Sequence, residues 1–79
     1  MDERLQDLSP GMTGEVVGYA NAGRGYRERL LAMGLTRGTH FTVVRVAPLG
    51  DPVELAVRGF SLSLRKAEAD ALKVRRVRS

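Results

Sequence analysis

The chain has 79 residues, and its 13 lysine and arginine residues outnumber its 9 acidic residues, which gives a formal net charge of +4. This length predicts one domain over residues 1–79, with a small core of marginal stability. Cysteine is absent, which excludes disulfide scaffolds and thiolate metal sites. No apolar run approaches the roughly 20 residues that span a bilayer, and the charged N-terminus is unlike a signal peptide, so we expect a protein of the cytoplasm. The basic balance would attract nucleic acid, acidic proteins or anionic lipid alike.

The first half of the chain predicts a strand followed by a short helix. Residues 14–20 form the strand, and Gly18 inside it indicates a bulge or a close backbone approach. The glycine-rich residues 21–25 then break the strand. Over residues 26–33 the apolar period changes to that of a helix, and Gly34 follows where a left-handed residue would end it. So short a helix must pack on the strands, because it is not stable alone in water.

The second half predicts three further strands before the C-terminal end. Residues 41–46 are apolar with an imperfect alternation, which indicates strong bending. Residues 53–58 and 60–65 alternate cleanly between apolar and polar. Gly59 lies between these two stretches and predicts a tight hairpin with the glycine in a special conformation.

A one-turn helix over residues 66–71 and a last strand from Leu72 complete the expected order. Five short strands in so small a chain favour closure, which hides the sheet edges. The expected fold is therefore mainly β: a small SH3-like five-stranded barrel with one inserted short helix and the one-turn helix before the last strand. The predicted core consists of Val16, Leu30, Met33, Val43, Leu55, Val57, Leu62, Leu64 and Val74, and both phenylalanines, Phe41 and Phe60, also fit it.

The segment 47–52 predicts a stiff loop with an apolar tip. Pro48 and Pro52 lack backbone donors and cannot lie inside a sheet ladder, and Gly50-Asp51 between them favours a turn. Leu49 would then be exposed with little conformational entropy left to lose on binding. This arrangement suits a partner-binding protein better than an enzyme.

Candidate contact residues lie in this loop and near the helix. Leu30 and Met33 are assigned to packing, whereas charged or less buried neighbours remain free for a partner. Residues 23–25 are interpreted either as a simple connector or as a contact loop that meets an acidic surface. The predicted partner-binding set is Arg24, Tyr26, Arg27, Leu31, Leu49 and Asp51.

No catalytic, metal or cofactor site is expected. His40 is the single histidine, and it lies in the opposite strand phase to Phe41, so we expect it to face solvent. Ferrous sites of the facial-triad type need two histidines and a carboxylate. Ser61 and Ser63 are assigned to the solvent side of their strand. Residues 23–25 lack the Gly-Lys-Ser/Thr ending of a phosphate loop.

Three spaced motifs carry a resemblance to a known family. They are Arg-Leu-Leu-Ala-Met-Gly-Leu at 29–35, Ala-Pro-Leu-Gly-Asp-Pro at 47–52 and Val-Arg-Gly-Phe-Ser-Leu-Ser-Leu-Arg at 57–65. From about Leu5 to Val74 the chain resembles the FeoA family of small cytosolic proteins attached to bacterial ferrous-iron uptake. The resemblance implies an SH3-like barrel and an accessory role by contact with FeoB, the membrane iron transporter with a cytosolic GTP-binding domain. Any GTP chemistry would then belong to the partner.

Two other functions remain open on the sequence. One is a small basic SH3-like barrel that binds nucleic acid, although the chain has only two tyrosines and two phenylalanines for stacking. The other is a regulatory module related to the C-terminal domain of metal-dependent repressors. Self-association through Leu49 also stays open. The basic end, residues 75–79, is interpreted as a frayed terminus.

Overall fold

The computed structural model describes residues 3–20 and 24–77, which form one antiparallel sheet with two helices and two 3-10 turns. No helix in this described part is long and apolar enough to cross a membrane. The strands are β1 (Glu3–Arg4), β2 (Thr13–Tyr19), β3 (His40–Val46), β4 (Val53–Val57), β5 (Phe60–Leu64) and β6 (Leu72–Val77); the helices are α1 (Arg24–Ala32) and α2 (Lys66–Asp70), and the 3-10 turns are η1 (Leu5–Asp7) and η2 (Pro48–Gly50).

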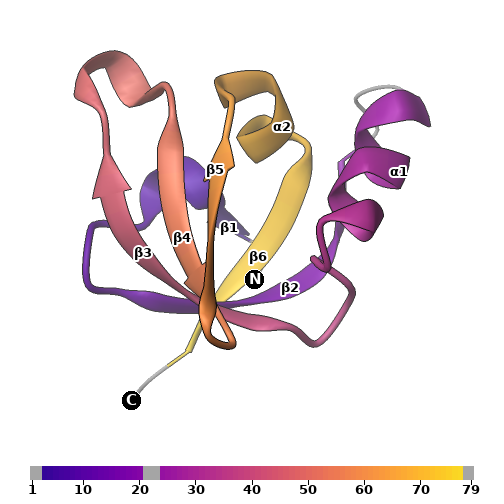
Figure 1. Cartoon of the computed structure of the whole chain (residues 1–79), viewed down its shortest axis with the longest axis horizontal. Coiled ribbons are helices and arrows are strands. Elements are labelled where there is room, and N and C mark those ends of the chain that lie inside the picture. Colours follow the sequence, from indigo (N-terminus) through magenta and orange to yellow (C-terminus); the bar gives the residue numbers. More distant parts are fainter. Residues whose placement is uncertain (1–2, 21–23, 78–79) are drawn as a thin grey trace.

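The sheet has the strand order β1-β6-β2-β3-β4-β5 and curls around the core. Figure 1 shows β3 and β4 rising on one side, β6 and β2 on the other, and α2 above the space between them. The mainly β, SH3-like fold is confirmed. The expected five-stranded closed barrel is not: in the described residues a sixth strand, β1, pairs with β6, and β1 and β5 are both edge strands. Because α2 contacts β5, β6 and η1, it covers the core at the end where α2 lies in Figure 1.

A bulge in β2 decides which side chains face inward. Val16 pairs with Val74 of β6, but the next pair is Gly18 with Lys73, so Val17 is an extra residue. The shift places Gly18 on the outer face and turns Tyr19 toward the core, where its hydroxyl donates to the Leu35 carbonyl at 2.6 Å. The predicted bulge at Gly18 is confirmed. A second register shift, between Val43 and Arg45, accounts for the expected bending of β3.

The core contains most of the residues that the pattern predicted. Seven of the nine are buried, and Met33 and Leu62 are partly buried and pack against the others. Phe41 is buried, whereas Phe60 is 46% exposed, so its assignment to the core was wrong. Phe60 directly follows the hairpin turn on the edge strand β5, and burial rises along its side of the strand from Phe60 through Leu62 to Leu64, whereas its partner on β4, Val57, is buried.

The predicted turns agree with the backbone geometry. Gly34 has φ +92° and ends α1, and the Leu35 N–H donates to the Leu30 carbonyl at 3.0 Å. The helix begins at Arg24, so residues 24 and 25, expected in the connector, form part of its first turn. Residues 21–23 lie outside the described part of the chain.

The basic C-terminal end belongs to the sheet. Residues 75–77 form the last part of β6 and pair with Glu15, Gly14 and Thr13 of β2. The interpretation of this end as frayed is therefore wrong for residues 75–77. Residues 78 and 79 lie outside the described part.

Candidate partner-binding surface

The loop between β3 and β4 presents Leu49 to solvent. Pro48 begins the 3-10 turn η2, and Leu49 adopts a left-handed conformation with φ 71°. The Gly50 N–H donates to the Ala47 carbonyl at 2.8 Å, and the Ala47 N–H donates to the Pro52 carbonyl at 3.0 Å. These bonds tie the loop across its base, and the Leu49 side chain is 96% exposed. The predicted exposed apolar tip is confirmed.

A hollow of about 400 Å³ lies between this loop and α2. Leu49 and Val53 line it from the loop and β4, and Ala69 and Asp70 line it from α2. Asp70 Oδ1 is buried and has no hydrogen-bond partner among the described residues. Gln6 and Lys66 also line the hollow, which therefore combines apolar and polar side chains. Asp51 is exposed next to Leu49.

The second group of predicted contact residues lies on α1. Leu31 is 39% exposed, and Tyr26 is half-buried against the core. The Arg27 guanidinium carbon lies 5.8 Å from the centre of the Tyr19 ring, within the range of a cation–π contact. Arg24 is the first residue of the helix, and its side chain lies outside the described part of the structure. This surface is basic with an apolar spot.

The fold does not bring the two groups together. In Figure 1, α1 lies at the right of the molecule and the η2 loop at the upper left, with α2 between them. Leu49 and Asp51 therefore form one candidate patch, and Tyr26, Arg27 and Leu31 form another on α1, the helix that begins at Arg24. A single partner would have to be large to contact both at once.

A buried carboxylate, which the sequence did not indicate, connects the two helices. Glu68 is only 5% exposed. Its Oε1 accepts the Arg65 N–H at 2.9 Å, and its Oε2 accepts from Arg29 Nη1 at 3.1 Å. The bond to Arg65 is half of a capping box, which a Glu three residues into a helix can signal. The burial and the contact with α1 carried no signal, because Arg29 is remote in the sequence.

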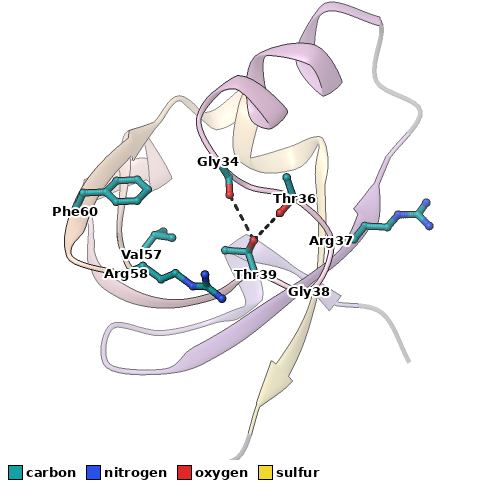
Figure 2. Close-up of a pocket in the computed structure, with 8 residues that line it drawn as sticks. All are labelled: Gly34, Thr36, Arg37, Gly38, Thr39, Val57, Arg58 and Phe60. Atoms are coloured by element: carbon teal, nitrogen blue, oxygen red, sulfur yellow. Dashed lines mark hydrogen bonds between the residues drawn. The ribbon is translucent and has the colours of Figure 1, made fainter.

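Figure 2 shows a further hollow of about 290 Å³, which lies between the α1–β3 turn and the β4–β5 hairpin. Phe60 and Val57 line one side, and Thr36 and Thr39 line the other. Thr39 Oγ1 lies 3.0 Å from Thr36 Oγ1 and donates to the Gly34 carbonyl at 3.4 Å. Sequence reasoning missed this surface because it had placed Phe60 in the core.

His40 faces solvent, as predicted. Its side chain is 58% exposed, and its Nε2 lies 4.0 Å from Glu15 Oε1. Within residues 3–20 and 24–77 there is no group of three or more His, Cys, Asp or Glu side chains that could hold a metal ion. The expectation of no metal site stays a prediction.

The FeoA domain model matches residues 3–76, which is nearly the whole chain. The chain belongs to the FeoA family. It is 38% identical over 77 residues to the Fe(2+) transport protein A/Fe(2+) transporter FeoB fusion protein of Porphyromonas gingivalis. That match covers 96% of this FeoA-family chain but only 9% of the fusion protein.

Solved structures agree with this assignment. The FeoA-like protein from Clostridium acetobutylicum superimposes with a TM-score of 0.86 and 33% identity, over 99% of this chain and 90% of that one. A manganese-dependent transcriptional repressor superimposes with a TM-score of 0.88 over 96% of this chain and 37% of its own. Its identity is 18%, so this likeness shows the shared fold alone.

Proposed function

We propose that this FeoA-family chain is a non-enzymatic accessory protein of bacterial ferrous-iron uptake. It acts in the cytoplasm by contacting the cytosolic, GTPase-containing part of a FeoB-like transporter. The observation that carries the proposal is the relative from Porphyromonas gingivalis, whose name describes a fusion of Fe(2+) transport protein A with the transporter FeoB in one polypeptide. Covalent joining keeps two domains at a high effective concentration, which is useful when they work in contact.

The proposed contact is centred on Leu49. A stiff loop with an exposed leucine binds with little ordering cost, and the hollow beside it can receive an apolar side chain of the partner. The patch on α1, with Arg24, Tyr26, Arg27 and Leu31, is the second proposed contact, and its arginines would meet acidic groups.

The test is the affinity of the purified chain for the isolated cytosolic domain of the FeoB encoded in the same genome, measured by titration calorimetry. Leu49→Asn is the informative variant, because asparagine tolerates the left-handed backbone at this position while removing the apolar tip. We expect it to weaken binding by roughly tenfold or more, as for a central contact residue.

Val44→Thr is the matched control. Val44 is also an exposed apolar residue, on β3, and lies outside both patches. It should leave the affinity unchanged. Absence of binding by the unaltered chain would contradict the proposed function, and an unchanged affinity of Leu49→Asn would contradict the assignment of the loop.

The nucleic-acid alternative has less support. Of the four aromatic residues, only Phe60 is exposed; Phe41 is buried, and Tyr19 and Tyr26 are half-buried against the core. Single-stranded nucleic acid needs aromatic platforms in a basic groove. The likeness to a repressor does not favour a regulatory function, because it is a likeness of fold.

A further inference from the structure

The outer face of β1, β6 and β2 carries a row of basic side chains. Arg4 pairs with Lys73, and Lys73 pairs with Gly18, so these three positions share one side of the sheet. Arg4 and Lys73 are both exposed. Gly18 lies on this face only because of the bulge at Val17.

The side chain of Arg37 brings a third cation next to this row, over Gly18. A Cβ at Gly18 would lie 3.9 Å from Lys73 Cδ and 4.0 Å from Arg37 Nη2, so both side chains extend over the bare backbone. Figure 2 shows Arg37 pointing away from the hollow at Phe60, in keeping with this position over β2. We call Arg4, Arg37 and Lys73 the basic face.

Two acidic side chains near the basic face already have partners within the chain: Asp7 Oδ2 accepts the Arg4 N–H at 3.2 Å, and Glu15 binds Arg75. Glu15 belongs to the neighbouring row, where Arg75 Nη2 donates to its Oε1 at 2.5 Å. In the described residues the side chains of the basic face form no ion pair. Like charges placed side by side on a sheet are unfavourable unless an anion lies between them. An external polyanion would relieve the repulsion among these cations.

The shape of the face distinguishes among polyanions. Gly18 contributes no side chain, and the register shift that places it on the outer side of the sheet turns Tyr19 inward, which leaves no aromatic ring among the paired residues of this face. Stacking of unpaired bases is thereby disfavoured. Cationic side chains on an open sheet surface suit a layer of phosphate groups at the same level.

We propose that the basic face rests on anionic phospholipid headgroups, with Arg4, Arg37 and Lys73 each close to lipid phosphates. Cations near an anionic leaflet are attracted within about one Debye length, so the attraction falls with salt. The inference goes beyond the proposed function, because it requires neither a transporter nor the Leu49 loop. It gives the chain its own affinity for the surface in which a transporter would lie.

The test is co-sedimentation of the purified chain with vesicles of phosphatidylcholine and phosphatidylglycerol, and with vesicles of phosphatidylcholine alone. We expect binding to the anionic vesicles only, weaker at high salt. Each cation near the surface contributes about fivefold to the binding constant. The double variant Arg37→Gln/Lys73→Gln should therefore bind roughly 25-fold more weakly.

The control is Arg45→Gln/Lys66→Gln, which removes the same net charge from two exposed positions on β3 and α2. This control variant should retain most of the vesicle binding. Circular dichroism of both double variants is the check that each one folds. Equal losses in the two variants would overturn the proposal, since net charge alone would then explain the binding. Absence of sedimentation with anionic vesicles would overturn the proposal too. So would binding of the chain to a single-stranded oligonucleotide without binding to the anionic vesicles.

Discussion

At the scale of single residues, Gly14 shows how one backbone position depends on a distant side chain. Gly14 pairs with Phe41 across β2 and β3. A Cβ at Gly14 would lie 2.6 Å from Phe41 Cζ and 3.1 Å from Leu8 Cδ1. Both neighbours are buried, so neither can move into free space. The glycine is required by contact and not by its backbone conformation.

We expect Gly14→Ala to lower the free energy of unfolding by about 2 kcal/mol, the usual cost of overpacking a core. Urea denaturation measures it. Gly25→Ala is the matched control: Gly25 lies in the first turn of α1, and a Cβ there meets nothing within 4 Å. Alanine favours helix, so this change should be neutral or stabilise by up to about 1 kcal/mol. Similar losses in both variants would show that the contact with Phe41 is not the cause.

At the scale of elements, the sequence predicted features that depend on neighbouring residues. The helix before Gly34, the hairpin at Gly59 and the bulge at Gly18 each follow from periodicity or from glycine, and each was found near its predicted place. Features that depend on the whole sheet were not predicted. The two-residue β1 has no periodicity to detect, and the exposure of Phe60 depends on where the core ends.

The same division applies to the candidate site: its local features were predicted from the sequence, and its long-range contacts were not. The exposure of Leu49 followed from local turn chemistry and was confirmed. The hollow with Asp70, the contact between Glu68 and Arg29 and the convergence of Arg37 with Lys73 join residues remote in sequence. Contacts between such distant residues leave no local pattern in the sequence, so they become visible only once the fold is known.

The β4–β5 hairpin can be stabilised at its turn. Arg58 and Gly59 have φ values of 35° and 86°, and two left-handed residues in succession form the turn that favours Asn-Gly. We expect Arg58→Asn to raise the free energy of unfolding by about 0.5 kcal/mol, because asparagine tolerates this backbone better than arginine. Arg58→Val should lower it, since a β-branched side chain is strained there. Thermal unfolding of both variants checks the order, and equal midpoints would contradict it.

At the scale of the whole molecule, an open sheet must protect its edges without a closed ring of hydrogen bonds. β1 is only two residues long, which leaves little edge for another chain to pair with. β5 is longer, but Ser61 and Ser63 are exposed and polar, and basic residues follow at 65 and 66. Short, polar and charged edges are the usual ways in which a small sheet avoids aggregation.

The unpaired edge of β5 has a measurable consequence. In a two-residue hairpin the residues that flank the turn form a hydrogen-bonded pair, here Val57 and Phe60, and bonded pairs then alternate along the strand. The N–H groups of Leu62 and Leu64 therefore bond to β4, whereas those of Ser61 and Ser63 face the free edge. Amide hydrogen exchange followed by NMR should show slow exchange at Leu62 and Leu64, and exchange close to that of a free peptide at Ser61 and Ser63. If the two serines were as protected as Leu62, a ring closed against β1 or a partner strand would have to cover this edge, and the open sheet would not describe the molecule in solution.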